Sequence, residues 1–270
     1  MTNLNNAVVL LTGATGGFGT ELTRQLLQAG SRLIMTDINK TNLDSLATEI
    51  TQKITTGKII ACIASDLAST EGCNALFQQV KALNVPVDVL INNAGIGLYG
   101  RMDEVPVDKW ERLMQVNLLA PMRLSSLFAT NMVERQQGHI VNISSLAGWI
   151  APAGMAHYSC SKFGLRGFSE GLFNELKPHN IRVTAVYPFF SRTPILRSES
   201  FGTLAKDGDN FPEKLATDPA KVMAKTIKAI QQDKLHVFPD RMAYSLGILK
   251  QYFPKALDLM GDRLSQTTDD

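Results

Sequence analysis

Short apolar runs alternate with longer amphipathic stretches along most of this 270-residue chain. The first run, 7–12, ends in a glycine-rich turn, and a pattern with helical spacing follows as far as about Gly30. The alternation predicts about seven strands, over 7–12, 32–36, 58–64, 87–91, 139–143, 181–186 and 235–238. It predicts further helices over 70–83, 107–134, 157–176 and 220–231.

Repeated strand–helix units of this size favour an α/β fold, in which helices cover both faces of a parallel sheet. We therefore predict a single domain spanning residues 1–270, with a Rossmann-type doubly wound sheet. Right-handed crossovers place the carboxyl ends of the strands, and the ligand, along one edge. The residues that follow predicted strands, and are expected to share a site there, are Thr12, Asp37, Asp66, Asn92–Gly95, Ser145 and Pro188.

Two segments depart from this alternation. Residues 189–219 contain several prolines and show no clear period, and long irregular connections in compact domains are usually functional, so we expect a substrate lid. Residues 241–260 predict a C-terminal helical extension with an apolar stripe of Met242, Leu246, Ile248, Leu249, Tyr252, Phe253 and Leu257. Packing of this helix on the body or on another subunit is favoured over contact with a membrane surface.

Composition narrows the class of protein. With 44% hydrophobic and 19% charged residues the chain can form a sizeable core, and its net charge of +2 gives no reason to expect nucleic acid. Cys62, Cys73 and Cys160 lack metal-ligand spacing, so we predict no metal site and a reducing compartment. The apolar run 7–11 is too short for a signal peptide or a membrane span, which predicts a cytoplasmic protein.

The glycine-rich turn reads Gly13-Ala14-Thr15-Gly16-Gly17-Phe18-Gly19 and lies between a predicted strand and a predicted helix. In that context glycines let the backbone approach a dinucleotide pyrophosphate, which meets free N–H groups at the helix N-terminus. The alternative is an ordinary strand–helix turn. The strand–turn–helix–strand context favours nucleotide binding.

Asp37 follows the second strand, 18 residues after Gly19, near the offset of an acid that bonds the adenosine ribose. It could instead cap the next helix. An acid facing the ribose opposes a 2′-phosphate, because like charges about 4 Å apart at an effective dielectric constant of roughly 20 repel by about 4 kcal/mol. Lys40 is the nearest cation. The pattern therefore favours NAD over NADP.

Tyr158 and Lys162 are four residues apart, so on a helix they project from one face with about 5–6 Å between their Cβ atoms. The ammonium is expected to lower the pKa of the phenol toward neutrality, which requires about 4 kcal/mol. Such a phenol can serve as a general acid or base. Ser145 would hold the reacting oxygen by hydrogen bonding. A surface tyrosine and a solvated lysine at this spacing are the alternative.

Taken together, these motifs resemble the short-chain dehydrogenase/reductase superfamily, in its single-domain branch. The resemblance is close over about residues 7–194 and rests on Thr12-Gly13, Gly17-Phe18-Gly19, the tetrad Asn92-Asn93-Ala94-Gly95, Asp66-Leu67, Asn117 within Val116-Asn117-Leu118, and Ser145, Tyr158 and Lys162. Gly16 also allows the glycine spacing of the longer, epimerase-like branch, but the tetrad is typical of the shorter one. Ser145 is chosen over Ser144 because it lies thirteen residues before Tyr158.

The resemblance implies hydride transfer between NAD(H) and a carbonyl or secondary alcohol. It implies that Tyr158 protonates the oxygen, Ser145 holds it, Lys162 stabilises tyrosinate and bonds the nicotinamide ribose, and Asn117 interrupts its helix and holds a relay water. From its pattern alone, Asn117 could be a solvent-facing residue. The implied cofactor contacts are Gly13, Thr15, Gly16, Gly17, Phe18, Gly19, Asp37, Ile38, Asp66, Leu67, Asn93, Ala94, Gly95, Tyr158, Lys162, Pro188 and Thr193.

One position departs from the family pattern. Pro188 and Thr193 keep their offsets, but Phe189 stands where the family usually has glycine, so its side chain must turn away from the nicotinamide or narrow the pocket. Large apolar side chains flank the site, which suggests a hydrophobic substrate, although such residues are usually core. The predicted substrate contacts are Ser145, Trp149, Tyr158 and Phe189.

Three functions remain in contention. An NAD-linked dehydrogenase or reductase is favoured over an NAD(H)-sensing binding protein, because a sensor does not need the set Asn117, Ser145, Tyr158 and Lys162. A lyase or epimerase that uses NAD transiently is disfavoured by the length and the tetrad. The expected partners are a small-molecule substrate and a second copy of the chain, as a homodimer or homotetramer.

Overall fold

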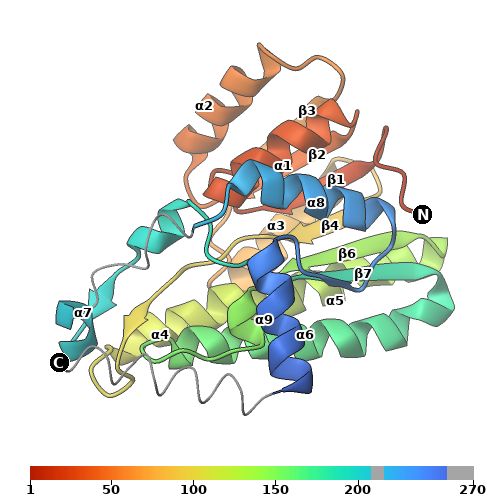
Figure 1. Ribbon diagram of the computed structural model, residues 1–270. Coiled ribbons are helices and arrows are strands. Elements are labelled where there is room, and N and C mark those ends of the chain that lie inside the picture. The colour runs from red at the N-terminus through yellow and green to blue at the C-terminus, as the bar shows by residue number, and fades with distance from the viewer. Residues whose placement is uncertain (208–215, 254–270) are drawn as a thin grey trace.

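Seven parallel strands form the central sheet of the protein, as seen in a computed structural model that describes residues 1–207 and 216–253 (Figure 1). The strand order is β3-β2-β1-β4-β6-β7-β9. The strands are β1 Val8–Thr12, β2 Arg32–Asp37, β3 Lys58–Ala64, β4 Val89–Asn92, β6 Gly138–Ile143, β7 Ile181–Val186 and β9 His236–Val237. The predicted α/β class, the parallel sheet and the strand positions are confirmed, with ends that differ by one or two residues.

Helices cover both faces of this sheet. They are α1 Gly17–Gln28, α2 Lys40–Thr51, α3 Thr70–Ala82, α4 Val107–Met114, α5 Ala120–Arg135, α6 Ala156–Leu176, α7 Thr203–Asp207, α8 Pro219–Gln231 and α9 Arg241–Tyr252. Successive side chains of β1 point to opposite faces. Val9 and Leu11 pack in a core with α1, α2 and α8, whereas Val8 and Leu10 pack with α3, α5 and α6.

Helix α2 was not delimited by the sequence pattern. Only Leu43 and Ile50 of its side chains are buried, so its apolar periodicity is weak. The Asn39 side chain caps it by accepting a hydrogen bond from the Asn42 N–H at 3.0 Å. The helix is therefore marked by its cap rather than by an apolar stripe.

The helix predicted over 107–134 is interrupted. A π-helical turn, η1 Gln115–Leu119, lies between α4 and α5 and contains Asn117. A π-turn inserts one extra residue and leaves the regular hydrogen-bond ladder locally shifted. The interruption that the family resemblance implied is therefore present in the backbone.

The segment expected to be irregular, 189–219, contains more structure than its composition indicated. A 3-10 turn η4 (Pro194–Arg197), strand β8 (Ser200–Phe201) and helix α7 lie within it. Strand β8 pairs in parallel with β5 (Tyr99–Gly100), so this segment lies against the connection that follows β4. Residues 208–215 lie outside the described part of the chain.

The predicted C-terminal helix is α9, which crosses over β7 and α6 in Figure 1. Leu246 of α9 packs with Tyr187 and Trp149 in a small core cluster. The remainder of the prediction, 254–260, lies outside the described residues. Within 1–207 and 216–253, every helix is too short or too polar to cross a lipid bilayer.

Candidate active site

The ends of β1 and β4 are locked together at the carboxyl edge of the sheet. The Thr12 hydroxyl accepts hydrogen bonds from the Asn93 and Ala94 N–H groups, each at 3.0 Å. The Asn93 carboxamide returns two more, to the carbonyls of Thr12 and Gly13 at 3.0 Å. Gly13 has φ of +64°, and a Cβ there would lie 2.7 Å from the Ala94 Cα, so only glycine fits this approach.

The glycine turn suits a phosphate group. Helix α1 begins after Gly16, whose backbone is extended, and the described side chains supply no cap to its N-terminus and no acid to its first turn. Its first N–H groups and the positive end of the helix dipole are therefore available to receive an anion. A Cβ at Gly19 would lie 2.0 Å from the Gly13 carbonyl oxygen, so the turn cannot accept a larger residue. Phe18 packs beside the α1 core.

Asp37 lies beside this turn, at the end of β2. One carboxylate oxygen accepts from the Thr15 N–H at 2.9 Å and from the Thr15 hydroxyl at 2.7 Å, and the other accepts from the Ile38 N–H at 2.8 Å. Ile38 is 59% exposed and can cover one side of a ligand. The nearby Lys40 ammonium is paired with Asp44 at 2.6 Å. Thr15, Asp37 and Ile38, three of the predicted cofactor contacts, therefore lie next to one another.

Asp66 and Leu67 follow β3 on the same edge. The Asp66 carboxylate accepts from the Ala68 N–H at 3.0 Å and forms an exposed ion pair with Arg112 at 3.2 Å. Leu67 is buried with α3 in the core. Asp66 therefore also contacts α4, the helix that leads to Asn117, and its role beside the adenine stays a prediction.

Asn117 anchors the chain that follows β4. Its carboxamide oxygen accepts from the Ile96 N–H and its nitrogen donates to the Ile96 carbonyl, both at 2.9 Å. The side chain is fully buried, so the alternative of a solvent-facing residue is wrong. A Cβ at Gly95 would lie 3.4 Å from the Asn117 oxygen and 3.7 Å from the Lys162 Nζ, so this segment passes directly over both side chains.

Tyr158, Lys162 and Ser145 meet where β6 ends. The Lys162 ammonium lies 5.6 Å from the centre of the Tyr158 ring and donates to the Ile143 carbonyl at 3.1 Å. The Ser145 side chain hydrogen-bonds the phenol and also accepts from the Ala147 N–H at 3.1 Å. Both Tyr158 and Lys162 are buried, so the alternative of a solvated surface pair is wrong.

The direction of the expected pKa shift is also wrong. Burial raises the pKa of Tyr158 to about 12, although the hydrogen bond from Ser145 opposes this rise. Burial lowers the pKa of Lys162 to about 8. Loss of hydration disfavours tyrosinate and ammonium alike, and the ammonium donates to a backbone carbonyl. Tyr158 therefore carries its proton at neutral pH.

The segment after β7 closes the other side of the glycine turn. Pro188 accepts a hydrogen bond from the Leu146 N–H at 2.9 Å, which ties it to the residue after Ser145. A Cβ at Gly17 would lie 2.5 Å from the Thr193 Cγ2, so Thr193 packs directly on the turn. Its predicted contact with a carboxamide stays a prediction.

The two predicted apolar substrate contacts pack together with the C-terminal helix. Phe189 and Trp149 belong to the cluster that includes Leu246, and Trp149 is 9% exposed. The Arg166 guanidinium lies 3.3 Å from the centre of the Trp149 ring. The Phe189 ring also meets Phe190 edge-on, with centroids 5.2 Å apart.

Sequence reasoning missed one residue beside the site, Asp240. Its buried carboxylate accepts from the Phe189 N–H at 3.0 Å and from the Ala243 N–H at 2.7 Å. An acid directly before a helical pattern is a recognisable N-cap. Its second partner, 51 residues earlier in the chain, leaves no local signal.

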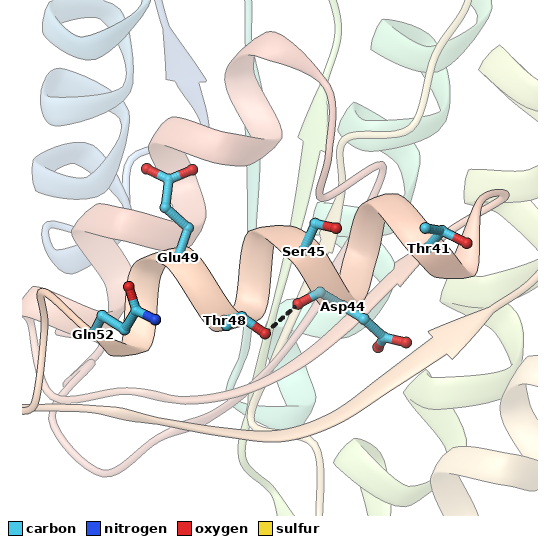
Figure 2. Close-up of a pocket in the computed structure, with 6 residues that line it drawn as sticks. All are labelled: Thr41, Asp44, Ser45, Thr48, Glu49 and Gln52. Carbon is cyan, nitrogen blue, oxygen red and sulfur yellow. Dashed lines mark hydrogen bonds between the residues drawn. The ribbon is translucent and has the colours of Figure 1, made fainter.

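A separate depression lies over α2 (Figure 2) and has no part in this arrangement. Its lining side chains all come from that helix and its C-cap residue, Gln52, and the Thr48 hydroxyl donates to the Asp44 carbonyl at 2.8 Å. Side chains from a single exposed helix cannot enclose a ligand on several sides. The site residues predicted from the sequence meet instead at the carboxyl edge of the sheet.

Known proteins resemble this chain over the part that contains the candidate site. The chain matches the family model described as short chain dehydrogenase over residues 7–201. It is 34% identical over 199 residues to the 3-dehydrosphinganine reductase of Danio rerio. That match spans 73% of this chain and 60% of the relative, so the chain covers less than two thirds of the relative's length.

Two solved structures resemble the whole chain. One is a short-chain dehydrogenase from Sphingobium yanoikuyae in complex with NADPH, with 26% identity, a TM-score of 0.78 and coverage of 98% of this chain and 96% of that one. The other is a bulky-bulky ketone specific alcohol dehydrogenase from Comamonas testosteroni, with 26% identity, a TM-score of 0.77 and 95% coverage of both chains.

Proposed function

The chain belongs to the short-chain dehydrogenase family, and on that premise we propose that it is an NAD-linked oxidoreductase that interconverts an apolar ketone and the corresponding secondary alcohol. Members of the family act on CH–OH and C=O groups. The observation that carries the proposal is the meeting of Ser145, Tyr158 and Lys162 at the sheet edge that also holds the glycine turn.

The protein residues divide the work between binding and proton transfer. A bound nicotinamide dinucleotide supplies or accepts the hydride. The turn of Gly13–Gly19 would hold its phosphates, and Asp37 its adenosine ribose. In reduction, Tyr158 donates its proton to the developing alkoxide while the Ser145 hydroxyl holds that oxygen. A phenol with a pKa of about 12 suits this direction, since it is protonated at neutral pH yet more acidic than an alkanol.

Asp37 supports NAD as the cofactor. Its carboxylate is held at the turn by the Thr15 N–H and hydroxyl, so it cannot swing away from an added 2′-phosphate without breaking both hydrogen bonds. Lys40, the nearest cation along the sequence, is engaged by Asp44. NADP is the alternative cofactor, because one of the similar solved structures is in complex with NADPH.

The apolar cluster around Phe189 supports an apolar substrate of medium size or larger. Tyr158 packs with Leu98, Leu113 and Ala147. Leu146, directly after Ser145, packs with Trp149 and Tyr187, so both reacting residues adjoin apolar clusters. The solved relative specific for bulky-bulky ketones points to the same class.

A fluorescence assay of NADH oxidation across ketones graded in size and polarity tests this function. We expect turnover with NADH that is faster for bulky apolar ketones than for acetone. Tight NADH binding without turnover on any ketone or alcohol would instead identify a sensor.

We also propose that the protein is a homodimer or homotetramer. Met122 of α5 and Phe163 of α6 are 38% and 41% exposed, which leaves apolar surface on the outside of these helices. Light scattering coupled to gel filtration measures the assembly directly, and a monomer at micromolar concentration would refute this part.

A further inference from the structure

Asp240 joins two segments that are far apart in the chain. Its Oδ2 atom accepts from the Phe189 N–H at 3.0 Å, directly after β7 and Pro188, and its Oδ1 atom accepts from the Ala243 N–H at 2.7 Å, in the first turn of α9. The residue is 8% exposed. A buried carboxylate that receives two N–H groups is a strong, charge-assisted link.

Helix α9 continues this link into the core. A Cβ at Gly247 would lie 2.6 Å from the Phe238 ring, so the absence of a side chain lets the helix approach closely. Leu246, one residue earlier, packs in the cluster that contains Phe189 and Leu146. Asp240 therefore fixes the N-terminal end of the helix that carries Leu246.

The same cluster leads to the reacting groups. Leu146 directly follows Ser145, and its N–H donates to the Pro188 carbonyl at 2.9 Å. The peptide bond between Pro188 and Phe189 is therefore held at both of its polar groups. Its carbonyl oxygen accepts from the Leu146 N–H, and its N–H donates to Asp240. Fixing both groups fixes the direction in which the Phe189 side chain leaves the backbone.

We propose that Asp240 is a positioning residue that holds Phe189 and α9 as one wall of the substrate site and thereby sets the preference for bulky apolar ketones. This inference rests on the proposed function for the identity of the substrate. Asp240 itself touches neither substrate nor reacting atoms. It acts through the Phe189 backbone, and its loss allows the wall to move.

Two substitutions separate this role from helix capping. Serine caps helices about as well as aspartate, but its single, shorter side-chain oxygen cannot accept from Ala243 and Phe189 together. Asp240→Ser therefore keeps the cap of α9 and removes the link to Phe189, whereas Asp240→Ala removes both. Ser245→Ala, at an exposed position of α9, is the matched control.

For Asp240→Ser we expect the KM for bulky apolar ketones to rise roughly tenfold, the scale of one lost charge-assisted hydrogen bond. The KM for acetone, the kcat values and the Kd for NADH should stay near those of the wild type, and the Tm should fall only by the amount that one lost hydrogen bond explains. Asp240→Ala should show the same KM change and a lower Tm than Asp240→Ser, because it also loses the cap. An unchanged KM profile, or an equal rise for acetone and bulky ketones, would overturn the proposal.

Hydrogen exchange of the Phe189 amide gives a readout that does not depend on activity. The amide should be protected in the wild type and in Ser245→Ala, and should exchange faster in Asp240→Ser; equal protection would overturn the link. If the wild type turns over no ketone, the proposed function fails, and the exchange result still decides whether Asp240 holds Phe189. If Asp240→Ser does not fold, Asp240→Asn replaces it, since its carboxamide oxygen keeps the cap while its NH2 group faces the Phe189 N–H.

Discussion

Burial acts more strongly on Tyr158 and Lys162 than these residues act on each other. The phenol's pKa rises to about 12 and the amine's falls to about 8, both because the charged forms lose hydration. Each shift favours the neutral form of its group. The proposed reductive cycle therefore starts with the proton on Tyr158, and the Ser145 hydroxyl donates to the phenolic oxygen, which opposes part of the rise in its pKa.

Removing the phenolic hydroxyl tests this assignment. Tyr158→Phe should lower kcat by roughly 10²- to 10⁴-fold, the usual contribution of a general acid, while the Kd for NADH by fluorescence titration stays unchanged. Tyr244→Phe, at a tyrosine that is 57% exposed on α9, is the control and should keep full activity. A Tyr158→Phe enzyme with near-normal rates would exclude Tyr158 as the acid.

The proposed preference for NAD rests on the Asp37 carboxylate. Asp37→Ala should raise kcat/KM for NADPH relative to NADH by roughly tenfold or more, because it removes a charge opposed to the 2′-phosphate. Asp108→Ala, an exposed acid in the first turn of α4, should leave the ratio unchanged. Unchanged ratios in both variants would show that Asp37 does not face the ribose.

At the residue scale, sequence reasoning located groups but not their partners. It placed Asp37 at the end of a strand, yet the hydrogen bonds from Thr15 depend on how the turn folds back. It placed Lys162 beside Tyr158, yet the pKa shifts depend on burial, which only the packed structure reveals. The partnership of Asp240 with Phe189 likewise spans two elements that no local pattern connects.

Elements with a strong apolar period were predicted well, and elements held by polar contacts were not. Strands β1 and β4, for example, are buried on both faces and read as apolar runs. Helix α2 depends on its Asn39 cap, and β5 and β8 are two-residue strands whose pairing joins positions about one hundred residues apart in the sequence. The π-turn at Asn117 has no apolar signature, and only the family resemblance indicated it.

The predicted lid is held at Thr203 by Glu104. Its carboxylate accepts from the Thr203 N–H at 2.8 Å and the Thr203 hydroxyl at 3.0 Å, at the start of α7. Glu104→Ala should therefore speed limited proteolysis within 194–207 and raise the KM for substrate a few-fold. Glu111→Ala, at an exposed position of α4, is the control. Equal cleavage rates would show that Glu104 does not retain the lid.

The whole molecule carries a pH-sensitive contact at the edge of the sheet opposite the site. His139 of β6 is fully buried between the Thr2 and Thr184 hydroxyls, each at 2.8 Å from a ring nitrogen. Burial lowers its pKa to about 4. An unfolded chain binds this proton near pH 6.5, so the free energy of unfolding should fall as the pH drops from about 6.5 to 4.

Comparing free energies of unfolding at pH 7 and pH 5 measures this contribution, which is at most about 3 kcal/mol over the full window. His139→Gln should show a smaller pH 7 to pH 5 difference than the wild type, and His179→Gln in the surface turn after α6 should not. Burial also lowers the pKa of His157 and of His236, so His139→Gln should still lose some stability between pH 7 and pH 5. The pKa of Asp233 is lowered from 3.8 to about 2, so its contribution to the free energy of unfolding is lost only below about pH 3.8, outside this comparison. Identical pH differences in the wild type and His139→Gln would refute the role of His139.

At this scale the fold class followed from strand–helix alternation, whereas the strand order did not. An alternating pattern requires a parallel sheet but allows β4 to lie on either side of β1. In the structure β1 lies between β2 and β4, so the chain reverses direction across the sheet at the position where Thr12 meets Asn93. Ligands bind at such reversal points in open parallel sheets.

The pairing of β5 with β8 has a consequence for the timing of catalysis. The Tyr99 N–H donates to the Glu199 carbonyl at 3.1 Å, so the cover of the site is fastened by main-chain hydrogen bonds as well as by side chains. If product leaves between β5 and β8, these hydrogen bonds must break and re-form in each cycle. Such a motion takes microseconds to milliseconds, and a viscous solvent slows it. Turnover would then fall with added sucrose, and a deuterated nicotinamide would slow it less than the chemical step alone requires.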